Sequence, residues 1–255
     1  MSEHNLFPSL KKLAITWGFL ALLIMSWLLP PISQIWERID YTLFNFLNQK
    51  FVWYFPGPYF WGLTTLKSFD VFIDIIFIAI AAYHVSTFTA GAERRYKMAQ
   101  YVFGFLYLVI GIFLIKRGTR VLIHEWIDWD RASPSAVVAD AIRLSALFPL
   151  MGLKDISHDC FPGDHAAFVF VWAGLMWRYA GKKYGSLAWA IALFCALPRM
   201  ITGAHWFTDV AVGATTITVI LLSLLKVGNY ENRAVLAIDC CLAKPWSLRY
   251  LPFLH

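Results

Sequence analysis

The chain has 255 residues, of which 59% are hydrophobic and only 15% are charged, and its formal net charge is +6. Soluble globular domains carry close to a quarter charged residues, so this composition excludes an ordinary soluble domain and an intrinsically disordered chain. Four cysteines are too few and too irregularly spaced for a disulfide framework or a CxxC zinc site. The basic residues lie between apolar runs rather than along one stripe, which predicts contact with an anionic membrane surface and not with nucleic acid.

Six apolar segments have lengths suited to membrane helices, because about 20 residues cross the hydrocarbon core of a bilayer. In chain order they span residues 13–31, 71–90, 98–115, 166–180, 185–197 with a continuation to about 204, and 206–225. The first ends in Leu29-Pro30-Pro31 without a small-residue cleavage site, so we expect a retained anchor rather than a signal peptide. Residues 32–69 are amphipathic and aromatic-rich, which fits either a helix in the headgroup layer or a loop with interfacial aromatics. We therefore predict an all-α integral membrane protein, with a six-helix membrane domain over residues 1–226 and a tail over residues 227–255.

Charged residues beside these segments predict the orientation. With six spans, both termini and the short basic segments fall on one side, which the positive-inside rule assigns to the cytoplasm. The basic residues concerned are Lys11, Lys12, Arg94, Arg95, Lys97, Arg178, Lys182, Lys183, Lys226, Arg233, Lys244 and Arg249. Residues 116–164 hold six basic and seven acidic residues, and this nearly neutral segment is expected on the outer side.

Three clusters of polar residues fall at the predicted outer ends of the spans. They are Arg131-Ala-Ser133-Pro134, Cys160-Phe-Pro-Gly163-Asp164-His165, and the stretch from Pro198-Arg199 to His205 and Asp209. On a helix, the four-residue spacing of His205 and Asp209 would place them within hydrogen-bonding reach. A carboxylate on one imidazole nitrogen fixes the tautomer and leaves the other nitrogen free to attack an electrophile.

Residues from all three clusters favour an anion. Gly163 and Asp164 open a predicted helix, where unpaired N–H groups and the helix dipole attract negative charge. Arg131 and Arg199 add guanidinium groups that fit phosphate oxygens. Together with a second imidazole at His165, these residue types are suited to phosphoryl transfer through a covalent intermediate.

Two simpler interpretations remain open for these residues. A single Arg or His beside a span is more often an interfacial anchor than a catalytic group. His165, His205 and Asp209 could also be three ligands of a metal ion. Because two arginines would repel a cation and hold a phosphate, we expect neither a metal nor a cofactor at this site.

The clusters resemble the three motifs of the type-2 phosphatidic acid phosphatase superfamily, which are K-x6-R-P, P-S-G-H and S-R-x5-H-x3-D. The third motif matches at Arg199, His205 and Asp209, with Pro198 in place of the serine. The second is present as Pro162-Gly163-Asp164-His165, with its inner pair altered. The first keeps Arg131, but Pro134 is displaced by two residues and His124 occupies the lysine position.

Longer stretches resemble one branch of this superfamily, the bacterial lipid A 1-diphosphate synthases, from about residue 14 to residue 226. These stretches are residues 131–134, 161–165, 176–179 and 203–209, together with Asn48-Gln49-Lys50 and Phe69-Asp70. The resemblance implies a multi-pass enzyme of the bacterial inner membrane with its site facing the periplasm. It also implies transfer of a phosphate from undecaprenyl pyrophosphate to the phosphate of lipid A, without a metal.

Carried over position by position, the resemblance implies that His205 forms a phosphohistidine and that Asp209 orients it. His165 would be the general acid and base. Phosphate would be held by Arg131, Arg199, Gly163 and Asp164, with His124, Ser133 and Lys50 as candidate accessory residues. For Asp164, capping the helix and orienting His165 is the preferred interpretation.

Two other functions compete with this one. A lipid phosphatase acting on undecaprenyl pyrophosphate or phosphatidylglycerophosphate would use the same residues and differ only in passing the phosphate to water. A lipid-binding or transport protein could use Arg131 and Arg199 to hold a phosphorylated headgroup. That second function gives the imidazole–carboxylate pair no role.

Overall fold

A computed structural model describes residues 10–54, 56–121, 131–157 and 160–244. Within these residues the secondary structure is helical and no strand is present, so the all-α prediction is confirmed for the described part of the chain. In order, the elements are α1 (Leu10–Leu28), α2 (Ile32–Phe44), η1 (Asn45–Lys50), η2 (Phe51–Trp53), α3 (Pro58–Leu63), α4 (Lys67–Ser86), α5 (Ala92–Arg120), α6 (Pro134–Val137), α7 (Leu144–Leu147), η4 (Pro149–Met151), α8 (Asp164–Ile201), η5 (Asp209–Ala214), α9 (Thr215–Leu224) and α10 (Tyr230–Ala243).

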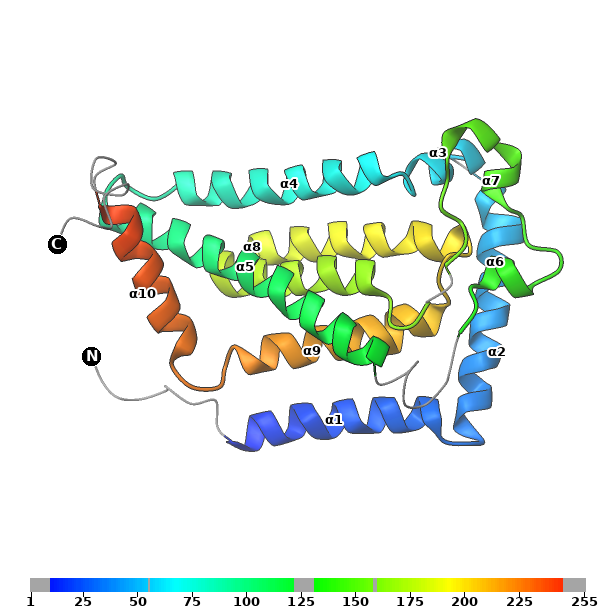
Figure 1. The fold of residues 1–255 in the computed structure, drawn as a ribbon, viewed down its shortest axis with the longest axis horizontal. Helices are drawn as coiled ribbons and strands as arrows, with labels where there is room; N and C mark the ends of the chain where they lie inside the picture. The colour runs from blue at the N-terminus through cyan, green and yellow to red at the C-terminus, as the bar shows by residue number, and fades with distance from the viewer. Residues whose placement is uncertain (1–9, 55, 122–130, 158–159, 245–255) are drawn as a thin grey trace.

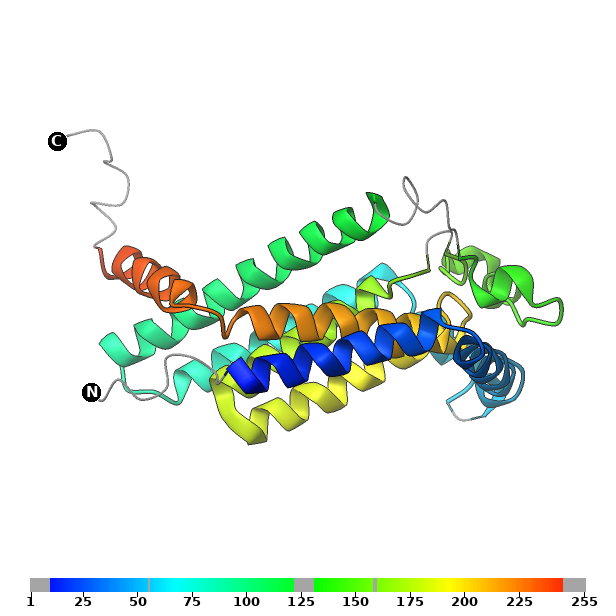
Figure 2. The same cartoon turned by 90° about the horizontal axis from the view of Figure 1, so that it is seen from below.

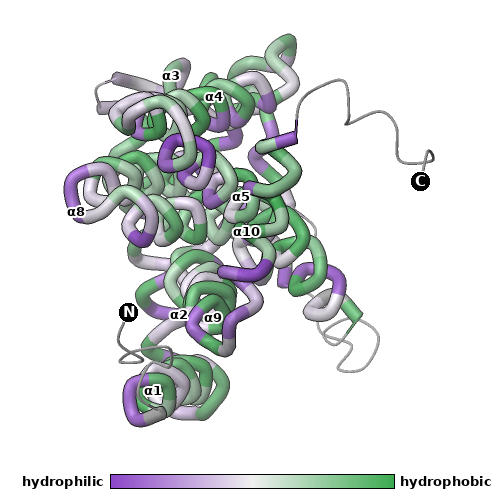
Figure 3. Tube along the Cα trace, turned by 90° about the vertical axis from the view of Figure 1, so that its left-hand side faces the viewer, coloured by the Kyte–Doolittle hydropathy of each residue, from purple (hydrophilic) through white to green (hydrophobic). Residues whose placement is uncertain are grey.

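The long helices run along the longest axis of the molecule (Figure 1). Four helices in the described residues, namely α1, α4, α5 and α8, are long and apolar enough to cross a membrane, and η5 and α9 form a shorter apolar segment over Asp209–Leu224. Large apolar side chains such as Phe19, Leu22, Ile75 and Phe113 are exposed on these helices. Hydrophobic residues therefore lie on the outer sides of the helices as well as between them (Figure 3).

Helix α8 is a hairpin rather than one straight helix. Its backbone leaves the helical region at Gly181, where φ is 76° and ψ is −172°. The two halves, residues 164–180 and 182–201, lie side by side in both views (Figures 1 and 2). Gly185 permits their close approach, because a Cβ added there would lie 2.6 Å from the Cα of Trp177. The predicted segments 166–180 and 185–204 correspond to these two halves.

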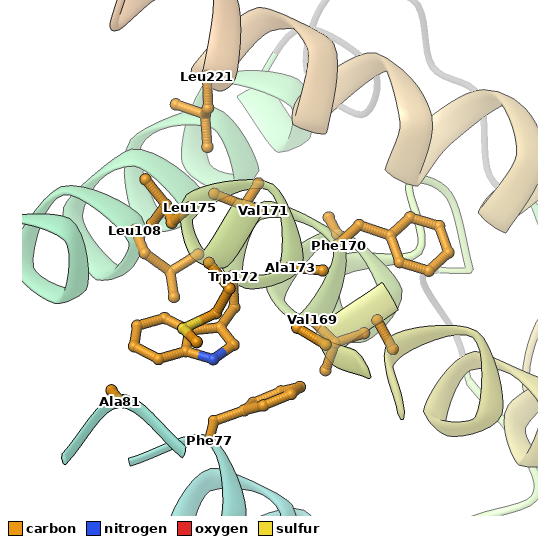
Figure 4. Packing of buried hydrophobic residues seen from close by; sticks show 14 of the residues in the cluster. Phe77, Ala81, Leu108, Val169, Phe170, Val171, Trp172, Ala173, Leu175 and Leu221 are labelled. Carbon is orange, nitrogen blue, oxygen red and sulfur yellow. The ribbon is translucent and has the colours of Figure 1, made fainter. Parts of the chain in front are cut away.

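The first half of α8 is the centre of the hydrophobic core (Figure 4). Trp172 faces Phe77 of α4, with 5.8 Å between ring centroids, while Leu108 of α5 and Leu221 of α9 belong to the same buried cluster. A helix packed by neighbours on several sides holds its N-terminal end, and therefore His165, in a fixed position.

Helix α2 crosses one end of the bundle, and α10 packs at the opposite end (Figure 1). Residues 32–44 are helical, and the placement of this helix in the headgroup layer stays a prediction. At the other end, Glu231 of α10 accepts hydrogen bonds from Arg178 at 2.6 Å and from Tyr179 at 3.0 Å. Asp239 pairs with Arg95 at 2.7 Å. The division of the chain at residue 226 stays a prediction, and the described part of the segment beyond it contains a helix packed on α5.

Candidate active site

A cavity of about 600 Å³ opens at the end of the bundle that α2 crosses. Its walls come from the beginnings of α4 and α8, the end of α5, the segment before Cys160, and the turn that follows α8. The polar and charged residues that line it are Asp70, Asp74, Lys116, Lys154, Ser157, Asp164, His165, Arg199 and His205. The second and third sequence clusters therefore meet in one cavity.

His205 lies in the turn between α8 and η5, and not on a helix as its spacing from Asp209 suggested. Gly203 forms this turn with a φ of 81° and lies against Ser135, so that an added Cβ would come within 2.8 Å of the Ser135 Cβ. The turn still brings the Asp209 carboxylate to 3.5 Å from the His205 Nδ1, because the Asp209 side chain folds back to accept the Trp206 N–H at 2.7 Å.

The tautomer of His205 is set by a backbone group. Its Nδ1 lies 2.8 Å from the carbonyl oxygen of Cys160, which is an acceptor only, so Nδ1 carries the proton. Nε2 then holds the free lone pair, and no hydrogen bond joins it to another described residue. Asp209 is the more distant partner of Nδ1, and it supplies negative charge beside the ring.

Arg131 sits in a buried ion-pair network beside the cavity. Its guanidinium donates to Asp209 at 2.6 Å, to Asp40 of α2 at 2.5 Å and to the Thr208 hydroxyl at 2.6 Å. Asp40 also accepts the Thr208 N–H at 2.9 Å. Burial raises the pKa of the Asp40 carboxyl above its usual value of 3.8, although the Thr208 hydrogen bonds and the charge of Arg131 oppose this effect.

The phosphate-binding role expected for Arg131 stays a prediction, and its placement differs from that of Arg199 and His165. The guanidinium is occupied by two carboxylates and is not among the cavity-lining residues. Asp40 lies 91 positions before Arg131 in the sequence, so no local pattern signals the pairing. In the structure, Arg131 links Asp40 of α2 to Asp209 at the start of η5, the carboxylate beside His205.

The cavity side of the site contains Arg199, His165 and a residue outside the predicted set, Asp70. The Asp70 carboxylate accepts two hydrogen bonds from Arg199, at 2.9 and 3.2 Å, and lies 3.5 Å from the His165 Nε2. Arg199 also donates to the Thr65 carbonyl at 3.3 Å. Burial and the charge of Arg199 favour the neutral form of His165, whereas the Asp70 carboxylate favours the protonated form that a general acid requires.

Asp164 and Gly163 occupy the N-terminal end of α8. The Asp164 carboxylate accepts the His165 N–H at 2.8 Å and forms an ion pair with Lys116 of α5. The Gly163 N–H donates to the Asp209 carbonyl at 3.0 Å, so it already has a partner and is not free for the anion that the sequence predicted there. An added Cβ at Gly163 would lie 2.9 Å from that oxygen, which explains the glycine.

Of the accessory candidates, the described residues Ser133 and Lys50 are not among those that line the cavity. Ser133 is fully buried and accepts the Ser157 N–H at 3.2 Å, and Lys50 is exposed at the end of η1. His124 falls outside the described residues. Sequence reasoning missed Asp70, Lys116 and Lys154 as cavity residues, and only the Phe69-Asp70 match pointed to one of them.

The alternative interpretation of the site was a metal ion bound by His165, His205 and Asp209. In the described residues, the potential ligands that lie within 4.8 Å of one another are instead Cys160, His205 and Asp209. The Asp209 oxygens are already bound by Arg131 and the Trp206 N–H, and the Cys160 Sγ lies 3.4 Å from the Ala204 carbonyl. The charge of Arg131 against this carboxylate disfavours a cation, so the donor set does not fit a metal ion well.

The chain is similar to known proteins over most of its length. Residues 50–233 match the model of the PAP2 superfamily. The lipid A 1-diphosphate synthase of Escherichia coli (strain K12) is 32% identical over 218 residues, which cover 85% of this chain and 87% of that protein. No solved structure matched the chain. The family and the relative support a phosphoryl-transfer function of the phosphatase or phosphotransferase type.

Proposed function

Because the chain belongs to the PAP2 superfamily, we propose that its cavity transfers a phosphate from undecaprenyl pyrophosphate to the phosphate of lipid A. One observation carries the proposal. His205, with its Nδ1 proton held by the Cys160 carbonyl, lines the same cavity as His165 and Arg199. A nucleophilic nitrogen, a proton donor and a guanidinium are the parts that phosphoryl transfer through an enzyme intermediate requires.

In the first half-reaction, the His205 Nε2 attacks the terminal phosphorus of the donor. The bond between this phosphorus and the bridging oxygen breaks, and undecaprenyl phosphate leaves with a proton from His165. Arg199 stabilises the charge on the transferred group. The positive charge on the His205 ring is stabilised by the Cys160 carbonyl at 2.8 Å and by the Asp209 carboxylate at 3.5 Å.

In the second half-reaction, an oxygen of the lipid A phosphate attacks the phosphohistidine. His165, now neutral, accepts the proton if the attacking oxygen carries one. The P–N bond breaks, lipid A diphosphate leaves, and the His205 lone pair is restored. The relative's name, lipid A 1-diphosphate synthase, supports lipid A as the acceptor.

The proposal includes an arrangement in the bacterial inner membrane. Helices α1, α4 and α5, the two halves of α8, and η5 with α9 would make six passes. The cavity would face the periplasm, and both termini with the tail of residues 227–255 would lie in the cytoplasm. The hairpin at Gly181 supports the count of six, because it makes two antiparallel helices out of α8.

The acceptor distinguishes the two candidate reactions. Purified protein would be incubated with undecaprenyl pyrophosphate labelled in its terminal phosphate, with and without lipid A, and the label followed by thin-layer chromatography. We expect label in lipid A, and none in a matched sample of the His205→Ala variant. Label released only as inorganic phosphate, whether or not lipid A is present, would assign the chain as a phosphatase instead.

A further inference from the structure

The cations around the cavity differ in how firmly they are held. Arg131 is bound by Asp40 and Asp209, whose side chains are 2% and 0% exposed. Lys116 is bound by Asp164, and these two side chains are 51% and 36% exposed. Partners in a buried pair separate at a high cost, because each leaves an uncompensated charge out of water, whereas an exposed pair contributes little and exchanges partners readily.

The cavity contains as many fixed negative as positive groups. Its cationic side chains are Lys116, Lys154 and Arg199, and its acidic side chains are Asp70, Asp74 and Asp164. A phosphorylated headgroup adds at least one negative charge to this space, so its binding is favoured when a cavity cation pairs with the phosphate. Among the paired cavity cations, Lys116 is the more exposed, since Arg199 has a side-chain exposure of 10%.

Lys116 is also well placed for this role. It lies near the C-terminal end of α5, and its partner Asp164 is the residue before His165. An ammonium group that reaches Asp164 is therefore close to the proposed proton donor.

We propose that Lys116 binds the phosphate of the lipid substrate and that Asp164 holds its ammonium group at the cavity until substrate arrives. The assignment rests on the proposed function and adds a binding residue to the same site. In the free protein the Lys116 ammonium pairs with the Asp164 carboxylate, and in the complex it moves to a phosphate oxygen. Asp164 thus competes with the substrate for Lys116.

Competition predicts opposite effects for the two partners. Lys116→Gln removes a phosphate ligand and should weaken anion binding about tenfold, the size expected for a lost charge-assisted hydrogen bond. Asp164→Asn removes the competitor and should tighten binding, while its side-chain oxygen still accepts the His165 N–H. If Lys116 only neutralises Asp164, Lys116→Gln should have no effect once Asp164 is already Asn.

The test uses inorganic vanadate as the probe, with its affinity for the full-length protein in detergent measured by calorimetry. Wild type, Lys116→Gln, Asp164→Asn and the double variant form the cycle, and Lys182→Gln at the α8 hairpin is the control for loss of one positive charge. We expect weaker binding for Lys116→Gln, tighter binding for Asp164→Asn, and a loss of about tenfold from Asp164→Asn to the double variant.

Other results would overturn the assignment or its basis. Weaker binding in both single variants, or equal binding in Asp164→Asn and the double variant, would make Lys116 a structural partner only. If Lys116→Gln does not fold, Lys116→Arg replaces it and should keep a vanadate affinity near that of wild type. A tenfold loss of affinity in Lys116→Arg would contradict the proposal. Unchanged affinity in Asp164→Asn would also contradict it. Failure of wild type to bind vanadate at all would instead contradict the proposed function.

Discussion

Arg131 and Arg199 belong to the same residue type and to two of the polar clusters, yet their surroundings give them different roles. Arg131 bridges two carboxylates that are almost entirely buried. Arg199 pairs with Asp70, whose side chain is partly exposed to the cavity. A guanidinium between buried carboxylates holds the structure together, whereas one at a cavity wall is available to a ligand.

Substitution of each arginine by glutamine should separate these roles. Arg131→Gln leaves Asp40 and Asp209 buried without their cation, so we expect a loss of about 3 kcal/mol or more in the free energy of unfolding. Arg199→Gln should cost about 1 kcal/mol in stability, because its partner stays hydrated, but should abolish most phosphoryl transfer. Thermal unfolding in detergent and transfer of labelled phosphate measure the two effects. Equal losses of stability in the two variants would contradict different roles for Arg131 and Arg199.

The pH dependence of the Arg131→Gln variant provides a second check. Burial raises the pKa of Asp40, and loss of Arg131 removes an opposing interaction, so the folded variant favours the protonated carboxyl still more. The stabilisation that comes from a raised carboxyl pKa is fully present below 3.8, the pKa of this carboxyl in the unfolded chain. It is lost as the pH rises through the pKa of the carboxyl in the folded protein. The deficit relative to wild type should therefore grow as the pH rises above 3.8. A deficit that shrinks with rising pH would be inconsistent with a buried Asp40.

At the scale of elements, the apolar runs predicted where the long helices lie, because an apolar stretch of sufficient length has few alternatives to a helix. Two features needed tertiary information. Residues 202–206 form a turn that no pattern distinguishes from helix, apart from Gly203. The Asp40–Arg131 pair joins elements far apart in sequence, so the residues around Arg131 could not show that its guanidinium is paired with Asp40.

The α8 hairpin depends on Gly181, whose φ of 76° and ψ of −172° lie in a region that residues with a side chain avoid. We expect Gly181→Ala to lower the free energy of unfolding by about 1–3 kcal/mol. Gly18→Ala is the matched control, because Gly18 lies in α1 with open space around it. The control should be neutral or stabilising by up to about 1 kcal/mol. A neutral Gly181→Ala in the same thermal unfolding assay would argue against the hairpin.

On the scale of the whole molecule, charge is distributed unevenly between the two ends. The α8 hairpin with Arg178, Lys182 and Lys183 lies at the end where α10 packs, opposite the end that α2 crosses (Figure 2). The cavity is at the α2 end. The positive-inside rule then predicts that the cavity and the basic end face opposite sides of the membrane.

Reporter fusions test this orientation directly. Alkaline phosphatase fused after Arg95 or after Lys182 should be inactive, as expected for a cytoplasmic position, and a fusion after Ser157 should be active in the periplasm. Fluorescent protein fusions at the same three positions are the reciprocal control. The reverse pattern would place the cavity in the cytoplasm and remove the basis for a periplasmic lipid substrate.

The central claim is that His205 carries the phosphate between the two lipids. It is tested by rapid acid-free quenching of wild type, His205→Ala and His165→Ala after mixing with undecaprenyl pyrophosphate labelled in its terminal phosphate. We predict protein-bound, acid-labile label in wild type, none in His205→Ala, and a slower, smaller amount in His165→Ala, because the second histidine only moves a proton. Label on His165 in the His205→Ala variant would reverse the two roles, and no labelled protein at any time in wild type would contradict a phosphohistidine intermediate.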